Sequence, residues 1–223
     1  MSAAFARTDR ATETREAIMR AAERLYAEYG LIAVSNRQIS EAAGQGNNTA
    51  VGYHFGTKAE LVRAIIRSHS EAMEKYQERM LAGIGDSEDI RDWVACLVRP
   101  ATDHLASLGV PSWYARFAVQ VLTDPVLRAI VIDEALVRRP LQRVHDGLER
   151  CLGPLPAQVR AERGEMARHL ITHTCAERER ALAEGTRPGQ SSWEHVAIAL
   201  TDAITGLFLA PFTPRPEYLE DQR

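Results

Sequence analysis

Residues 44–58, GQGNNTAVGYHFGTK, gather side chains that suit three different kinds of chemistry. The glycines suit a phosphate-binding loop, the histidine suits a catalytic base, and the two asparagine amides suit hydrogen bonding to base edges. A phosphate-binding loop needs its glycines after a strand, with Ser or Thr following the lysine of GxxxxGK. Here helical sequence precedes the glycines, and an alanine follows Lys58. The pattern therefore argues against a phosphate-binding loop.

The sequence around this stretch predicts the elements that position it. Apolar residues three and four positions apart from Ile18 to Tyr29 predict a first helix that ends at Gly30. Residues 35–38, SNRQ, have the capping-box pattern that begins a helix, and residues 57–60, TKAE, repeat it. The residues between these two boxes suffice for a helix, a turn and a second short helix.

This arrangement, a helix-turn-helix, uses the chemistry of the side chains. Gly44 supplies the turn, and Asn47 or Asn48 caps the second short helix, whose first residues would face a DNA major groove. Asparagine pairs with adenine N6 and N7, and a threonine methyl packs on thymine, so Asn47, Asn48 and Thr49 are expected to read bases. An ordinary turn followed by a surface helix is the alternative. The predicted DNA-binding residues are Arg37, Gln45, Asn47, Asn48, Thr49, Tyr53, His54, Thr57 and Lys58, of which Arg37, Tyr53, His54 and Lys58 are expected to hold the phosphate backbone.

Residues 12–70 resemble the N-terminal DNA-binding domain of the TetR/AcrR family of bacterial transcriptional regulators. The resemblance rests on REAIMRAAERLYAEYG, SNRQISEAAG and YHFGTKAEL. It implies a homodimer on a near-palindromic double-stranded DNA operator, and a C-terminal helical domain that binds a small-molecule effector. It further implies that the effector releases the protein from DNA, which is how a repressor of this kind works. Between Gly44 and Phe55 this chain has one residue more than the common pattern, so which asparagine faces the groove stays open.

The remainder of the chain reads as helix, so we predict an all-α protein. Apolar spacing near the helical period predicts helices at 88–108, 112–122, 125–152, 157–184 and 191–210. Pro100 and Pro140 lie inside two of these segments and should kink or split them. The predicted organisation is a flexible N-terminal arm at 1–11, a three-helix helix-turn-helix domain at 12–58, a connecting helix at 57–82 and a helical effector-binding and dimerisation domain at 83–223.

Composition and charge narrow the class of protein further. Residues 1–70 hold 9 Lys/Arg against 7 Asp/Glu, while the remainder holds 18 against 23. The first 70 residues are therefore mildly basic and the rest of the chain is acidic. No run of about 18 apolar residues and no apolar signal region occurs, so neither a membrane span nor secretion is expected. Three cysteines far apart predict neither a disulfide framework nor a CxxC metal site. We therefore expect a cytoplasmic protein with no membrane partner and no cofactor.

The predicted C-terminal domain offers candidates for the effector site. Aromatic, apolar and polar side chains of its central helices can line a cavity between helices, although each is as readily a core residue. These candidates are Trp93, Leu97, His104, Trp113, Tyr114, Phe117, Gln120, Val121 and His145. No cluster of positive charge marks an anionic ligand, so we expect a largely apolar or aromatic effector.

The last predicted helix carries a line of small residues beside a line of large apolar ones. Small residues let another backbone approach closely, and a helix that is apolar on most sides is buried by partners. An ordinary core helix is the alternative. The resemblance implies that helices near 157–184 and 191–210 hold the dimer, and the predicted interface residues are Ala199, Ala203, Ile204, Gly206, Leu207 and Ala210.

Two other functions fit single features of the sequence. His169 and His173 share a helix face at i, i+4 spacing, which would suit a metal-responsive regulator of the same fold. The run HLITH lacks the glutamate of HExxH and Cys175 falls on a different face, so we prefer a structural or interface pair and predict no metal site. A helical enzyme would use His54 or His145, but neither GxSxG nor HExxH occurs. We therefore predict a regulator and not an enzyme.

Overall fold

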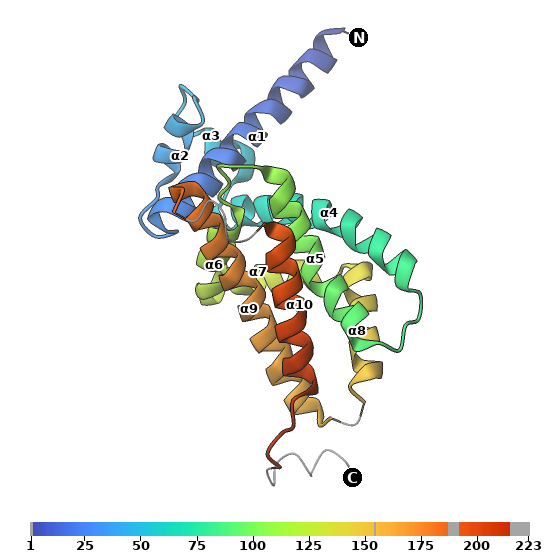
Figure 1. Ribbon diagram of the computed structural model, residues 1–223. Coiled ribbons are helices and arrows are strands. Elements are labelled where there is room, and N and C mark those ends of the chain that lie inside the picture. The colour runs from blue at the N-terminus through green and yellow to red at the C-terminus, as the bar shows by residue number, and fades with distance from the viewer. Residues whose placement is uncertain (1, 154, 187–191, 215–223) are drawn as a thin grey trace. The chain divides into compact units, whose positions relative to one another are not determined.

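The computed structural model of the protein describes residues 2–153, 155–186 and 192–214. These residues form ten α-helices and contain no β-strand, which confirms the predicted all-α class. Within the same part of the chain, no helix is long and apolar enough to cross a membrane. The helices (Figure 1) are α1 (Ser2–Tyr29), α2 (Asn36–Ala42), α3 (Ala50–Phe55), α4 (Lys58–Ile84), α5 (Ile90–Leu108), α6 (Tyr114–Thr123), α7 (Pro125–Leu136), α8 (Arg139–Cys151), α9 (Ala157–Glu184) and α10 (Trp193–Leu209).

The chain divides into two compact units. The first unit comprises Met1–His69 and Ser112–Glu134, and the second comprises Ser70–Pro111 and Ala135–Arg223. Helix α4 therefore starts in the first unit and continues into the second. Helix α6 and most of α7 belong to the first unit, together with α1, α2 and α3. The sequence groups all of 83–223 together, whereas packing places α6 and α7 with the N-terminal helices.

One helix boundary differs from the expectation drawn from the sequence, and one break in a helix agrees with it. Residues 2–11, expected to be a flexible arm, are helical and form the first turns of α1. The segment expected to be helical at 125–152 is split as its proline predicts, because α7 ends at Leu136 and α8 begins at Arg139. Pro140 lies at the start of α8, where the first N–H groups have no acceptor within the helix. Pro100, in contrast, lies inside α5, which continues past it.

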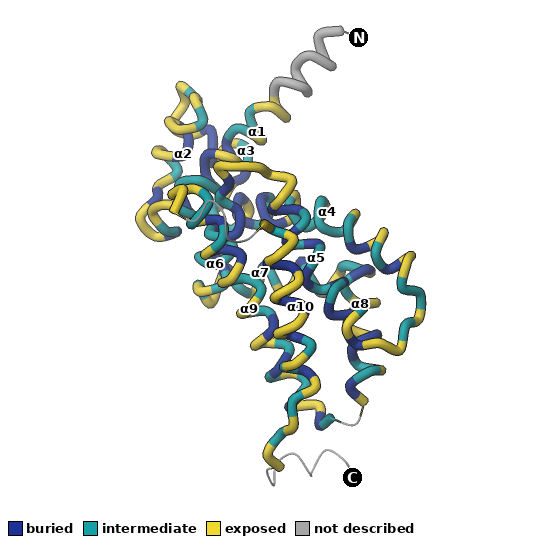
Figure 2. The backbone as a smooth tube through the Cα atoms, viewed as in Figure 1, coloured by how far each residue is buried: buried dark blue, intermediate teal, exposed yellow. Residues whose placement is uncertain are grey.

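The core of the first unit forms where α1 packs on α6 (Figure 2). Ile18, Ala22 and Tyr26 lie on one face of α1 and are fully buried, as their spacing predicts. The ring of Tyr26 stacks on Phe117 of α6 with centroids 6.1 Å apart. Trp113, at the start of α6, donates from Nε1 to Glu28 at 3.1 Å. Helix α6 thus supports the last turns of α1.

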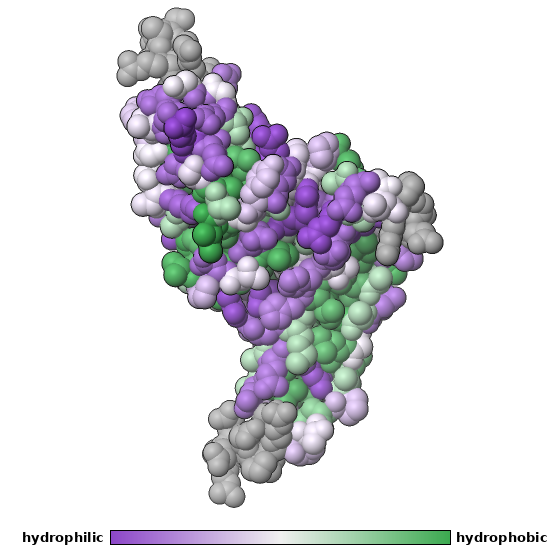
Figure 3. All heavy atoms as spheres, turned by 90° about the vertical axis from the view of Figure 1, so that its left-hand side faces the viewer, coloured by the Kyte–Doolittle hydropathy of each residue, from purple (hydrophilic) through white to green (hydrophobic). Residues whose placement is uncertain are grey.

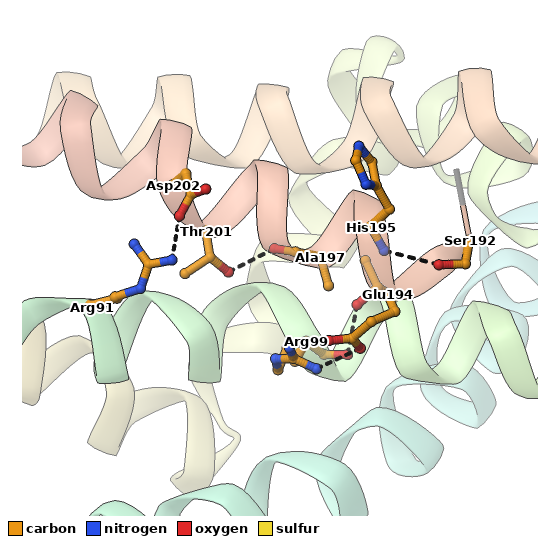
Figure 4. Close-up of polar contacts among 9 residues, drawn as sticks. Arg91, Arg99, Ser192, Glu194, His195, Ala197, Thr201 and Asp202 are labelled. Carbon is orange, nitrogen blue, oxygen red and sulfur yellow. Dashed lines mark hydrogen bonds and ion pairs between the residues drawn. The ribbon is translucent and has the colours of Figure 1, made fainter. Parts of the chain in front are cut away.

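In the second unit, α10 packs against both α5 and α9. Arg99 of α5 donates to both carboxylate oxygens of Glu194 at 2.6 and 2.9 Å, and Arg91 contacts Asp202 (Figure 4). Residue numbers rise along α5 as they fall along α10, so the two helices run antiparallel. Ser192 caps α10 by accepting from the His195 N–H at 3.2 Å.

Candidate nucleic-acid interface

Helix α2 begins where its capping box predicts. The Gln38 N–H donates to Ser35 Oγ at 3.3 Å, and the Ser35 N–H donates to Gln38 Oε1 at 2.8 Å. This reciprocal pair confirms the predicted box. Ile39 is fully buried, while Arg37 is exposed and donates to Glu41 one turn later at 2.8 Å. That hydrogen bond to Glu41 raises the pKa of Arg37, and the guanidinium on the exposed face of α2 is a cation at physiological pH.

A tight turn links α2 to the next helix. Gly44 has a φ of 68°, a conformation that other residues seldom adopt. The Gln45 N–H donates to Ser40 O at 2.9 Å, and Ser40 Oγ donates to Asn48 O at 3.5 Å. The side chain of Gln45 folds back, with Nε2 donating to Ala43 O at 3.1 Å. The turn is therefore held by its own polar groups, and Gln45 is half-buried in it.

The two asparagines have different roles in this turn. The prediction that one of them caps the short helix is wrong, because Thr49 occupies the N-cap position of α3 and its side chain makes no capping bond. Asn47 Oδ1 accepts from both the N–H and the hydroxyl of Thr49, at 2.9 and 2.7 Å, and Asn47 O accepts from the Ala50 N–H at 3.0 Å. Asn48 is exposed, and its backbone oxygen accepts the hydrogen bond from Ser40 Oγ. The oxygen of the Asn47 side-chain amide is thus engaged in hydrogen bonds within the protein.

Helix α3 presents one face to the core and the other to solvent. Val51 and Phe55 are buried, while Tyr53 is 84% exposed and His54 is half-buried. The rings of Tyr53 and His54 meet edge to face with centroids 5.0 Å apart. Gly52 is exposed, and a Cβ added there would meet nothing within 4 Å, so packing does not require a glycine. This glycine weakens the short helix by about 1 kcal/mol relative to alanine.

Lys58, expected to contact phosphate, points its ammonium group into the protein. Lys58 Nζ donates to Leu31 O at 2.5 Å and to Val34 O at 3.2 Å. It also lies 5.5 Å from the centroid of the Tyr26 ring. These contacts tie the start of α4 to the loop between α1 and α2. The amine is therefore occupied by backbone carbonyls of the protein itself.

Only half of the second predicted capping box forms at the start of α4. The exposed Thr57 accepts from the Glu60 N–H through Oγ1 at 3.1 Å. The Thr57 N–H donates to Phe55 O at 2.9 Å, which removes the donor that Glu60 would have accepted from. The carboxylate of Glu60 instead lies 3.6 Å from Arg63. Helix α4 is nevertheless capped at its first turn.

Sequence reasoning missed Arg15 of α1. Its guanidinium donates from Nη1 to the His54 carbonyl and lies 4.2 Å from the centroid of the Phe55 ring. Both partners belong to the last turn of α3. No motif marks this contact, because an arginine on the first helix looks like any other surface charge until the fold brings α3 beside it.

Comparison with known proteins agrees with this geometry. Residues 18–65, which contain α2, α3 and the start of α4, match the sequence model of the bacterial regulatory proteins of the tetR family. These residues of the chain thus form a DNA-binding domain of the TetR type. The HTH-type transcriptional repressor AcnR of Corynebacterium glutamicum is 27% identical over 158 residues, which cover 66% of this chain and 74% of that protein. The HTH-type transcriptional regulator TtgR of Pseudomonas putida is 26% identical over 199 residues, covering 89% and 80%.

A solved structure of a TetR family regulator shares the fold. The crystal structure of a TetR family transcription regulator from Marinobacter aquaeolei matches 90% of this chain and 97% of its own, with a TM-score of 0.56 and 16% identity. The matched domain and the two sequence relatives together support a DNA-binding transcriptional regulator and not an enzyme.

The nine effector candidates fall into both compact units. Trp113, Tyr114, Phe117, Gln120 and Val121 lie in the first unit, at or within α6. The Tyr114 ring stacks on His69 of α4 at 3.8 Å between centroids, so it is a packing residue of that unit. The other four candidates, Trp93, Leu97, His104 and His145, lie in the second unit.

Within the second unit, the four candidates differ in burial. Trp93 is fully buried and donates from Nε1 to Ser87 O at 2.8 Å. Its indole packs so closely on α8 that a Cβ added to Gly147 would lie 2.2 Å from it. His104 is buried, Leu97 is half-buried and His145 is exposed. Trp93 therefore belongs to the core of the second unit.

The proposed dimer helix α10 shows its small residues to solvent. Ala199, Ala203 and Gly206 are exposed, whereas Ile204 is fully buried against the core of the second unit, and Leu207 and Ala210 are half-buried. Large apolar side chains are exposed nearby on α9 and α10, where Figure 3 shows green surface: Met166, Leu170, Ile198 and Leu209. An apolar surface of this kind on paired helices is typical of an interaction site.

The histidine pair on α9 is exposed and close together. The rings of His169 and His173 have centroids 6.3 Å apart. Arg168 Nη2 lies 2.9 Å from His169 Nε2, so this ring nitrogen accepts a hydrogen bond from a cation. Among the residues that the structure describes, no group of three or more His, Cys, Asp or Glu side chains is placed to hold a metal ion.

Proposed function

We propose that the protein is a homodimeric, ligand-responsive repressor that acts in the cytoplasm and binds a near-palindromic DNA operator through α3. The observation that carries this proposal is the helix-turn-helix itself, in which Val51 and Phe55 anchor α3 while Asn48, Thr49 and Tyr53 face solvent. The family match over residues 18–65 and the repressor function named for AcnR support it.

Within the DNA-binding surface, we propose that Asn48 is the principal base reader. A bidentate contact to adenine needs both the oxygen and the amino group of the amide. Asn47 has its oxygen engaged by Thr49, whereas the side chain of Asn48 is exposed. The Asn47 amide holds the turn in the shape that presents Asn48 and Thr49.

Backbone contacts are proposed for the exposed or half-exposed polar groups around α3. Arg37 on α2 and Tyr53 on α3 are exposed, His54 is half-buried beside Tyr53, and the Thr57 hydroxyl lies at the start of α4. Phosphates are bound by such side chains and by free N–H groups at helix starts. Lys58 is left out of this set because its ammonium is occupied by the Leu31 and Val34 carbonyls.

Matched substitutions test the assignment of the asparagines. Asn48→Ser should reduce discrimination at one A·T position of each half-site by about tenfold to a hundredfold, the usual value of one bidentate pair. Asn47→Ser keeps an oxygen that can accept from the Thr49 N–H, so discrimination should change little. Binding is measured against operator variants with single base-pair changes. The reverse result, with Asn47→Ser relaxing specificity and Asn48→Ser silent, would contradict the assignment.

The presence of an operator is tested directly by a gel shift. DNA from upstream of the protein's own coding sequence should be retarded by the protein, and an unrelated duplex of equal length should not at the same salt concentration. Equal retardation of both fragments over a full salt titration would count against a specific operator there, because non-specific binding rests on phosphate contacts alone.

We further propose that α9 and α10 form the dimer interface, through Ala199, Ala203, Gly206 and the apolar side chains around them. Ala203→Glu should weaken dimerisation by about a hundredfold or more, because an unpaired charge would be buried between subunits. Ala129→Glu on the exposed side of α7 is the matched control. Sedimentation equilibrium over a range of concentrations measures both, and a dimer that survives Ala203→Glu would refute this interface.

The effector is proposed to be a small, largely apolar or aromatic molecule that binds to the helices outside the helix-turn-helix. It would favour an arrangement in which the two recognition helices are no longer about 34–36 Å apart, one turn of DNA. The operator affinity then falls by the ligand's differential affinity for the two arrangements. A thermal-shift screen identifies binders of the folded state. A binder that leaves operator affinity unchanged at saturation would not be the effector.

A further inference from the structure

We propose that Arg15 of α1 is a positioning residue that holds the recognition helix α3 in the orientation needed for reading DNA. This inference rests on the proposed function, since it takes α3 as the helix that enters the groove. The guanidinium of Arg15 donates to the His54 carbonyl and covers the ring of Phe55 at 4.2 Å. One side chain of α1 thus contacts the last turn of α3 through both a hydrogen bond and a cation–π interaction.

Helix α3 needs support from outside itself. It has six residues, and isolated helices shorter than about 12–15 residues are marginal in water. Gly52 lies in its middle, and its N-cap residue, Thr49, makes no side-chain capping bond. The buried residues Val51 and Phe55 anchor one face only. A cation that hydrogen-bonds a carbonyl of the last turn stabilises the other end, where the helix dipole is negative.

Helix α1 is a rigid support from which to hold α3. Arg15 lies one turn before Ile18 and shares its face with Ile18 and Ala22, which are both fully buried. From this side of α1 the guanidinium of Arg15 reaches the last turn of α3. The turn that it grips carries Tyr53 and His54, the proposed phosphate contacts. Loss of this grip would leave these two side chains without a fixed position.

Arg15 is itself exposed, so its removal should affect α3 far more than the fold as a whole. Arg15→Met removes the charge and the donor, and Arg15→Lys keeps a charge and one donor. The matched control is Arg20→Met on the same helix, since Arg20 is an exposed arginine that lies 3.6 Å from Glu16 one turn earlier. The three variants should unfold within a few degrees of the wild type.

The first measurement is hydrogen exchange of the free protein. The Tyr53 and Gly56 N–H groups donate to Thr49 O and Gly52 O, both at 2.9 Å, and so report on α3. Their exchange should be about fivefold to tenfold faster in Arg15→Met, through local opening of the short helix. Arg15→Lys should restore most of the protection, and Arg20→Met should match the wild type. Unchanged exchange in Arg15→Met would overturn the proposal.

The second measurement is binding to operator and to an unrelated duplex across a salt series. Arg15→Met should lower the ratio of specific to non-specific affinity about tenfold while the salt slope on both duplexes stays that of the wild type. A slope smaller by about one per subunit would show that Arg15 contacts phosphate itself and would overturn a positioning role. A wild-type protein that binds no DNA would overturn the proposed function, while the exchange result separately decides whether Arg15 supports α3.

Discussion

Replacing Lys58 with methionine separates two roles that a lysine at the start of α4 can have. Methionine keeps most of the aliphatic stem and removes the ammonium group, which donates to Leu31 O at 2.5 Å and Val34 O at 3.2 Å. A hydrogen bond from a charged donor contributes about 1.5–3 kcal/mol, and a cation near an aromatic ring contributes about 0.5–1 kcal/mol. The second bond is long and the residue is half-exposed, so we expect a loss of about 2 kcal/mol in unfolding free energy.

The assay follows stability and DNA binding in the same protein preparation. A loss of this size should lower the melting temperature by on the order of 5 °C. The slope of log affinity against log salt should stay that of the wild type, because the ammonium group is already bound by the protein. If Lys58 instead neutralised one phosphate in each subunit, the slope of a dimer would fall by about 1.8.

The control for this experiment is Lys75→Met, because Lys75 is the other lysine of the chain and is exposed on the same helix. It should change the melting temperature little. A Lys58→Met protein with wild-type stability and a reduced salt slope would refute the role read from the structure. It would return Lys58 to the phosphate contacts that the sequence suggests.

Three further substitutions test the packing and electrostatics of the two units. Gly147→Ala should lower the unfolding free energy by about 2 kcal/mol or more, since the new Cβ would lie 2.2 Å from the Trp93 ring; denaturation followed by tryptophan fluorescence measures this. Tyr26→Phe should leave stability unchanged or raise it by up to about 1 kcal/mol, because the buried Tyr26 hydroxyl has no hydrogen-bond partner among the described residues, and a loss above that size would contradict the assignment. Hydrogen bonds from Arg67 lower the pKa of the buried Glu134 below its usual value of 4.5, so Glu134 stabilises the fold above that pH and this contribution disappears as the pH falls through its lowered pKa. Glu134→Gln should therefore be less stable than the wild type at pH 7, with a difference that shrinks in acid; a difference independent of pH in urea titrations would show that the charge is not the cause.

The sequence by itself determined most of the helices and several of their ends. The capping box at Ser35 and Gln38, the glycine turn at Gly44 and the extent of α9 follow from residues three or four positions apart, and such residues interact in any helix whatever the rest of the chain does. The helix-turn-helix and the line of small residues on the last helix could be read for the same reason. Local signals are strong where a structure is made from neighbours in the sequence.

Only the tertiary structure decided where the charged side chains go. Lys58 reaches carbonyls 27 and 24 residues earlier in the chain, and Arg15 reaches one 39 residues later. A lysine or an arginine needs hydrogen-bond acceptors wherever it lies. The fold decides whether these acceptors are phosphates or carbonyls of the protein itself. Asn47 differs in kind, because its partner is two residues away and depends on the backbone angles of an irregular turn. Residue types in such a turn allow several hydrogen-bond patterns, and packing of α3 on the core selects one.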